Sequence, residues 1–284
     1  MSNTEVVLPS DRLAAKRADF IGQATAVEQA RAVAEVQAAV IVAQQVPRDM
    51  SKAVSEMRES CDQPGLADRA FYKYPRGGQS VSGPSVHLAR ELARTFGNVQ
   101  YGIVELRRDD IGKYSEMQAW AWDVQTNTRA SNTFVVPHKR DKKGGPEVLT
   151  DLRDVYENNA NMGSRRLREA IFSILPTWFT EEAKDRCMRT LESGGGKSLA
   201  QSVADAISRF DELGVPVDRI EAKLERKKKD WTAHDVAQLR VSYSSVKQGT
   251  VSVEDEFPQV RVSAASIARG ADQVSGELIS PEVA

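Results

Sequence analysis

Residues 98–136 read NVQYGIVELRRDDIGKYSEMQAWAWDVQTNTRASNTFVV, and this stretch decides the fold. It contains three segments rich in β-branched and aromatic residues, which strands favour. The segments are 98–108, 113–125 and 129–136. Turn-forming Asp, Gly, Thr and Asn residues separate them, so we expect three consecutive strands joined as an antiparallel meander.

The middle segment has a clear two-residue period, which places alternate side chains on opposite faces of a sheet. Tyr114, Trp120, Trp122 and Val124 share one face, and Met117, Ala119 and Ala121 share the other. Since both sets contain apolar side chains, we expect both faces of the sheet to be partly covered.

The stretch before the meander, residues 71–97, predicts a β-hairpin followed by a helix. Its aromatic first strand runs into a turn at Gly77-Gly78, and a second strand extends through Val81. The helix begins near Pro84, a residue favoured at helix starts. Two further helices precede the hairpin: a long amphipathic one at 25–46, rich in alanine and valine, and a shorter one at 49–61.

The segment after the meander, PHKRDKKGGPE at 137–147, predicts an exposed loop because it combines glycines and prolines with many charges. A long helix from about Asp151 to Pro176 and another from about Glu181 follow. Three short helices are then expected between 198 and 247, and from about Gln248 the composition indicates an extended or disordered tail.

These patterns predict an α+β fold: a β-hairpin, a helix and a three-stranded antiparallel meander, flanked by long helices, with a small C-terminal helical module. The expected domains are an N-terminal arm (1–24), a core domain (25–192), a linker (193–197), a helical accessory module (198–250) and a flexible tail (251–284).

Composition narrows the class of protein. The chain of 284 residues is 40% hydrophobic and 28% charged, with a net charge of −1 and two cysteines, Cys61 and Cys187. The absence of a long apolar run, a signal-peptide pattern and a disulfide framework indicates a protein of the reducing cytoplasm. Its three histidines are too widely spaced to predict a metal site.

Two groups of residues resemble catalytic motifs, but neither matches the motif closely enough to predict a catalytic site. GGGKS at 194–198 resembles a phosphate-binding loop, but Leu191 stands where that motif needs glycine, and the segment follows a helix instead of a strand. A metal-dependent nuclease would need clustered carboxylates. The candidates are Asp109, Asp110, Asp151, Asp154, Glu157, Glu181 and Glu182. Turn formation and helix capping explain Asp109, Asp110, Asp151 and Asp154 without catalysis.

Three basic clusters indicate binding of a polyanion, which demands many cations and little geometric precision. The candidate DNA-binding residues are Tyr72, Lys73, Tyr74 and Arg76 in the hairpin, Lys139, Arg140, Lys142 and Lys143 in the basic loop, and Arg165, Arg166 and Arg168 on the long helix. Tyrosines between cations suit base stacking. The alternative for each cluster is a solvated surface, with the tyrosines only packing the hairpin and Glu169 pairing with Arg165.

The order of elements resembles the phage single-strand annealing recombinases, the RecT and Red-beta superfamily, over about residues 25–192. PGLADRAFYKYPRGG, GPSVHLARELARTFGNVQYGIVEL, WAWDVQTNTRASNTFVVPHKR and ENNANMGSRRLREAIFSILP carry the resemblance. Residues 197–255 look like the helical tail modules appended to such proteins.

The resemblance implies a protein without enzymatic activity that binds single-stranded DNA and anneals complementary strands without ATP, in phage recombination and DNA repair in a bacterial cytoplasm. It implies a ring or helical homo-oligomer, no cofactor unless Mg²⁺ is bound together with DNA, and a tail that recruits the host single-strand-binding protein or a phage exonuclease. A metal-dependent nuclease and a self-assembling scaffold remain the alternatives.

Overall fold

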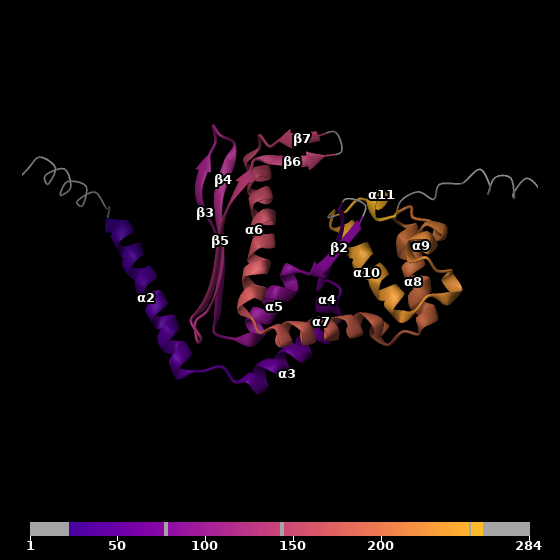
Figure 1. The fold of residues 1–284 in the computed structure, drawn as a ribbon, viewed down its shortest axis with the longest axis horizontal. Helices are drawn as coiled ribbons and strands as arrows, with labels where there is room; N and C mark the ends of the chain where they lie inside the picture. Colours follow the sequence, from indigo (N-terminus) through magenta and orange to yellow (C-terminus); the bar gives the residue numbers. More distant parts are fainter. Residues whose placement is uncertain (1–22, 77–78, 143–144, 250, 258–284) are drawn as a thin grey trace, which may run out of the picture. The chain divides into compact units, whose positions relative to one another are not determined.

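The computed structural model describes residues 23–76, 79–142, 145–249 and 251–257 (Figure 1). Its contacts divide the chain into two units. Unit 1 comprises Met1–Glu56 and Leu92–Pro176, and unit 2 comprises Met57–Glu91 and Thr177–Ala284.

The sheet of unit 1 confirms the predicted meander. Strands β3 (Val99–Asp109), β4 (Tyr114–Asp123) and β5 (Thr128–Pro137) pair antiparallel in sequence order. The register is regular along β4 and β5, whereas a bulge interrupts β3 between Glu105 and Arg107. The α+β class is therefore correct.

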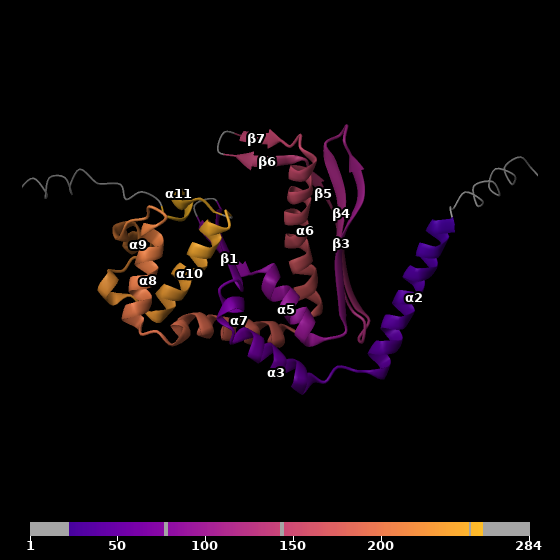
Figure 2. The same cartoon turned by 180° about the vertical axis from the view of Figure 1, so that it is seen from behind.

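Helix α6 (Leu152–Ile174) covers one face of this sheet (Figures 1 and 2). Every second residue of β4 is buried beneath it: Ser115, Met117, Ala119, Ala121 and Asp123. The approach is close, because a Cβ on Gly163 of α6 would lie 2.9 Å from Cγ2 of Ile103. The opposite face, with Trp120 and Trp122, is only half-buried.

The basic segment after β5 is not an irregular loop, as the sequence indicated, but a hairpin of β6 (Lys139–Lys142) and β7 (Gly145–Val148). Gly145 adopts a φ of 111°, which glycine tolerates and other residues rarely adopt. A two-stranded hairpin leaves its side chains in solvent, so the charges of this segment do not oppose strand formation.

The N-terminal part of unit 1 consists of α2 (Gln23–Gln45) and the start of α3 (Met50–Cys61), which confirms that the two predicted segments are helical. Helix α2 lacks the expected amphipathic pattern, because its exposed apolar side chains point in several directions around the helix axis. Five apolar side chains of α2 are 48% to 59% exposed: Val27, Val33, Val36, Ile41 and Val42. No helix of the described residues is long and apolar enough to cross a membrane.

Unit 2 contains the predicted first hairpin, β1 (Phe71–Arg76) paired with β2 (Gln79–Pro84). Helix α4 (Pro64–Ala67) precedes it, and α5 (Val86–Phe96) leads from unit 2 into unit 1. Helix α7 (Thr177–Glu192) begins directly after Pro176, four residues before its predicted start. The free thiols of Cys61 and Cys187 are buried together, and their hydrogen bond and burial raise the pKa of Cys187.

The C-terminal module has the three predicted helices, α8 (Leu199–Asp211), α9 (Val217–Leu224) and α10 (Ala233–Lys247). Short 3-10 turns lie at η1 (Gly194–Gly196) and η2 (Lys228–Asp230). Its buried core includes Phe210, Val215, Ile220, Trp231, Val236, Leu239 and Phe257.

The described residues after Gln248, namely 249 and 251–257, differ from the irregular tail that the sequence indicated, whereas residues 250 and 258–284 of that predicted tail lie outside the described residues. A short helix, α11 (Val253–Glu256), brings Phe257 into the core, where its side chain is fully buried. The Phe257 ring lies 4.8 Å from the ring of Phe210. Apolar burial of one aromatic side chain therefore orders this segment, although its sequence has no helical periodicity.

Candidate nucleic-acid interface

Two of the three predicted arginines on α6 are exposed. Arg165 has no salt-bridge partner among the described residues, whereas Arg166 lies 3.2 Å from Glu169. Glu169 thus pairs with Arg166, and the alternative that it pairs with Arg165 is not borne out. Arg168 is half-buried and has an interaction of its own.

The basic hairpin adds two exposed cations to unit 1. Lys139 and Arg140 lie on β6, and neither has an ion-pair partner in the part of the chain that the structure describes. The side chain of Lys142, and Lys143 altogether, lie outside the described residues. We call these three predicted residues, Lys139, Arg140 and Arg165, the free cations of unit 1. Lys113, Arg129 and Arg153 of the same unit are also exposed and have no ion-pair partner among the described residues.

A buried polar network fixes the point where β5 passes into β6. The Ser115 hydroxyl donates to Oε1 of Glu105 at 2.9 Å, and it receives a hydrogen bond from Nδ2 of Asn159 at 2.9 Å. Nε2 of His138 lies 2.9 Å from the same Ser115 oxygen. Because one hydroxyl can donate once and accept twice, Ser115 is fully satisfied when His138 donates.

Arg108 holds the acidic end of this network. Its Nε and Nη2 donate to the two carboxylate oxygens of Glu105 at 2.8 and 2.9 Å. This pair keeps the pKa of Glu105 below its usual value. The guanidinium of Arg108 also lies 4.7 Å from the ring centroid of Tyr156 on α6. Arg108 is therefore a structural residue.

We expect Ser115→Ala to lower the free energy of unfolding by about 2–3 kcal/mol, because it leaves buried Asn159 and His138 without their partner. Urea unfolding of the purified protein measures this. Ser131→Ala, on the exposed outer strand β5, is the control and should change stability by less than about 0.5 kcal/mol. Equal effects of both substitutions would contradict the role given to Ser115.

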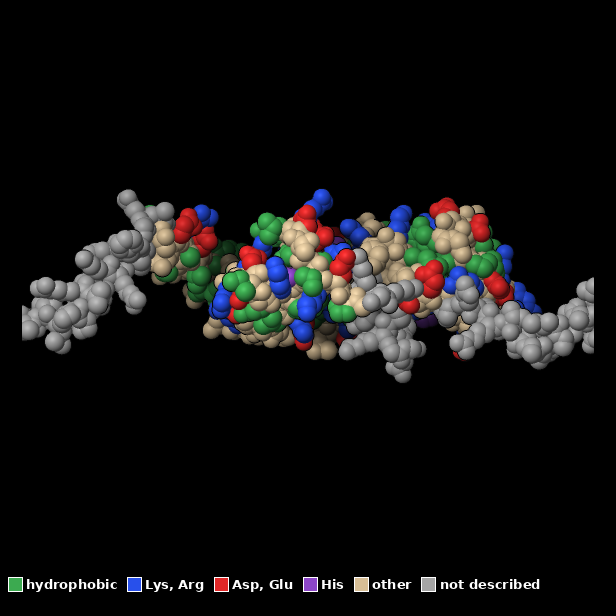
Figure 3. Space-filling model, turned by 90° about the horizontal axis from the view of Figure 1, so that it is seen from above, with side chains coloured by type: hydrophobic (Ala, Val, Ile, Leu, Met, Phe, Trp, Pro, Cys, Tyr) green, Lys and Arg blue, Asp and Glu red, His purple; other side chains and the backbone are tan. Residues whose placement is uncertain are grey.

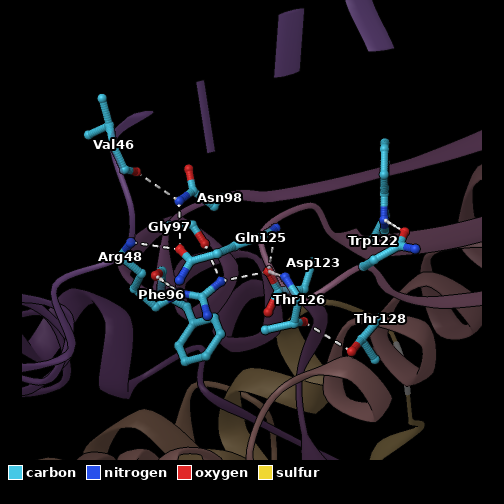
Figure 4. Close-up of polar contacts among 11 residues, drawn as sticks. Val46, Arg48, Phe96, Gly97, Asn98, Trp122, Asp123, Gln125, Thr126 and Thr128 are labelled. Atoms are coloured by element: carbon cyan, nitrogen blue, oxygen red, sulfur yellow. Dashed lines mark hydrogen bonds and ion pairs between the residues drawn. The ribbon is translucent and has the colours of Figure 1, made fainter. Parts of the chain in front are cut away.

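A second buried network joins the N-terminal segment to the sheet (Figure 4). Arg48 donates through Nε to the Phe96 carbonyl at 2.7 Å, and through Nη2 to the Gly97 carbonyl at 2.9 Å and Oδ1 of Asp123 at 2.8 Å. The Arg48 side chain is 6% exposed and that of Asp123 is 3% exposed. Sequence reasoning missed this ion pair, because no local pattern links the two residues.

The hairpin cluster belongs to unit 2, and its lysine is already engaged. Nζ of Lys73 lies 3.8 Å from the buried carboxylate of Glu256, which also receives contacts from Lys223 at 2.7 Å and Ser242 at 2.6 Å. Tyr72 is half-buried and has an interaction of its own. The side chains of Tyr74 and Arg76 lie outside the described residues. A groove bordered by this hairpin and the unit 1 cations remains a prediction.

Four of the carboxylates considered for a nuclease make local contacts within the chain, namely Asp109, Asp151, Glu181 and Glu182. Asp109 accepts hydrogen bonds from the backbone N–H groups of Ile111 and Gly112, and Asp151 caps α6. Among the described residues, no three His, Cys, Asp or Glu side chains are grouped as metal ligands.

The GGGKS segment is likewise occupied by contacts within the chain. Ser198 caps α8, and Lys197 pairs with Asp205. These contacts give both polar residues of the motif a role in ordering the start of the helical module.

Positive and negative side chains are interspersed in the view of Figure 3, in keeping with the net charge of −1. Local groups such as the free cations of unit 1 must therefore hold any polyanion. Family models, curated proteins and solved structures give no match to this chain.

Proposed function

We propose that this protein binds single-stranded DNA and anneals complementary strands without ATP, as a non-catalytic homo-oligomer of the bacterial cytoplasm. The observation that supports this most is the set of free cations on unit 1. Lys139, Arg140 and Arg165 are exposed and have no ion-pair partner among the described residues, so binding a phosphate would not require breaking a salt bridge.

The chemistry of annealing suits such a surface. Cations that hold the sugar–phosphate backbone leave the base edges free, so that a second strand can pair with them. No step needs a bond to be cleaved, and the proposal assigns no cofactor to the protein. Mg²⁺ would enter only together with DNA.

Self-assembly is proposed through α2. A helix of 23 residues is about 35 Å long, and α2 exposes five large apolar side chains along this length. These side chains are distributed around the helix axis, so burying all of them takes contacts with more than one neighbouring subunit, each of which would contribute hydrophobic free energy. A chain of such contacts between unlike surfaces gives a ring or a helical filament.

The helical module offers a surface for a protein partner. A groove of about 820 Å³ has Leu199, Val203 and Trp231 among its lining residues, together with Lys227, Lys228 and Lys229. Glu221 also lines the groove and pairs with Lys227 at 2.8 Å, so Lys228 and Lys229 are the cations that suit an acidic protein segment with an apolar residue. The proposed partners are the host single-strand-binding protein or a phage exonuclease.

Salt dependence tests the proposed binding. If each subunit neutralises about six phosphates, the logarithm of the affinity for an oligonucleotide should fall with the logarithm of salt concentration with a slope of about −4. Fluorescence anisotropy of a labelled dT oligomer, titrated at several NaCl concentrations from about 0.05 to about 0.4 M, measures this slope. A flat response would contradict a phosphate-binding surface.

A further inference from the structure

The face of the unit 1 sheet that α6 leaves uncovered has two tryptophans on its central strand. Trp120 is paired in register with Gly102 and Ser131, and Trp122 with Gln100 and Arg129. We call these six residues the open sheet face. Both tryptophans are half-buried, which leaves part of each side chain accessible to solvent.

The two indole rings are held in place by their surroundings. A Cβ at Gly102 would lie 2.9 Å from Nε1 of Trp120, so the Trp120 ring occupies the space that only a glycine leaves open. Nε1 of Trp122 donates to Oδ1 of Asn127 at 3.1 Å. Asn127 adopts a φ of 54°, which asparagine tolerates better than most residues. The rings are therefore preorganised.

The six residues of the open sheet face carry a single charge, which is positive. The four residues paired with the tryptophans include one cation, Arg129, and no carboxylate. The Arg129 guanidinium lies 5.9 Å from the ring centroid of Trp120. Gln100 and Ser131 supply side chains that can hydrogen-bond to a base or a sugar. An aromatic surface beside a cation and polar side chains is what base stacking requires.

Strand geometry sets the spacing of the two rings. Side chains two residues apart on a strand are separated by about 6.7 Å, which is about twice the 3.4 Å rise per nucleotide of a DNA strand in a duplex. Neighbouring bases can reach both rings only if the strand is extended and unpaired. The surface thus favours single strands over duplex.

We propose that the open sheet face is a stacking platform for the bases of single-stranded nucleic acid, with Trp120 and Trp122 contacting successive bases and Arg129 contacting the adjoining phosphate. This inference rests on the proposed binding of single-stranded DNA, and it assigns the bases to a surface separate from the free cations of unit 1.

Photo-crosslinking of the full-length protein tests the platform. A dT oligomer containing bromodeoxyuridine is irradiated with the protein, and the cross-linked tryptic peptides are identified by mass spectrometry. The platform predicts a cross-link in peptide 114–129, which contains both tryptophans. Cross-links confined to other peptides would overturn the inference.

A second test measures the affinity of tryptophan variants and of a control variant for the dT oligomer. Trp120→Leu/Trp122→Leu should weaken binding of the dT oligomer by at least about thirtyfold, since loss of aromatic stacking costs at least about fivefold per base and two rings are removed. Gly102→Ala, which displaces the Trp120 ring without removing it, should also weaken binding. Trp178→Leu is the control, because Trp178 is 52% exposed in unit 2, and it should bind like wild type.

The outcomes separate the two proposals. Unchanged affinity in the tryptophan variants, alongside lost affinity on replacing the free cations, overturns the platform and leaves DNA binding intact. If the tryptophan variants change the mass of the oligomer without changing the affinity for DNA, the open sheet face contacts a second copy of the chain. That result also overturns the platform. Failure of the wild type to bind any single strand overturns both proposals.

Discussion

Arg48→Met should lower the free energy of unfolding by about 3–5 kcal/mol, the usual cost of leaving one member of a buried ion pair alone. The substitution keeps an apolar side chain over the Phe96 ring, from whose centroid the guanidinium lies 3.5 Å. It removes the donors to the Phe96 and Gly97 carbonyls and leaves the Asp123 carboxylate buried without its cation. Urea unfolding followed by circular dichroism measures the change.

Two comparisons show whether the buried charge is the cause. Arg48→Met/Asp123→Leu should recover part of the loss, because no charge then remains unpaired. Arg31→Met removes an ion pair with Glu35 of the same 2.8 Å length, but both side chains of this pair are about 65% exposed. This substitution should therefore lower the free energy of unfolding by less than about 1 kcal/mol. A loss below about 1 kcal/mol for Arg48→Met would contradict the structural role of the pair.

Replacing the free cations of unit 1, as Lys139→Gln/Arg140→Gln/Arg165→Gln, should weaken single-strand binding by roughly 100-fold at 0.1 M salt. Three lost phosphate contacts make the log–log salt slope shallower by about 2, and the affinities of variant and wild type then converge near 1 M salt. Anisotropy titrations at several salt concentrations measure both quantities.

Lys227→Gln/Lys228→Gln/Lys229→Gln is the control for charge, because it removes three exposed cations from the helical module of unit 2. This variant should keep the wild-type salt slope. If both variants lose affinity equally, bulk charge and not the unit 1 surface governs binding, and the assignment of Lys139, Arg140 and Arg165 is wrong.

The sheet and the first hairpin could be predicted because their signals are local. Period-two alternation around Trp120 and the turn residues at Thr126-Asn127 specify strands and a reversal within a few residues. The turn predicted at Gly77-Gly78 lies outside the described residues. The basic hairpin β6–β7 was missed because its charges also suit a loop. Phe257 was missed because one aromatic residue produces no periodicity.

The partners of the candidate residues could not be predicted, because they come from distant parts of the chain. Lys73 and Arg165 belong to basic clusters that look alike in the sequence. Only the fold places Glu256 beside Lys73, and it leaves Arg165 without an ion-pair partner among the described residues. The sequence shows where the cations are clustered, but tertiary contacts decide which of these side chains remain available to a ligand.

Annealing of two complementary oligonucleotides without ATP, followed by fluorescence quenching, tests the proposed function most directly. We predict that the wild-type protein accelerates annealing and that Lys139→Gln/Arg140→Gln/Arg165→Gln does not, whereas the helical-module control variant retains the activity. Annealing by the wild type at the spontaneous rate, under conditions where the protein is folded, would contradict the proposed function.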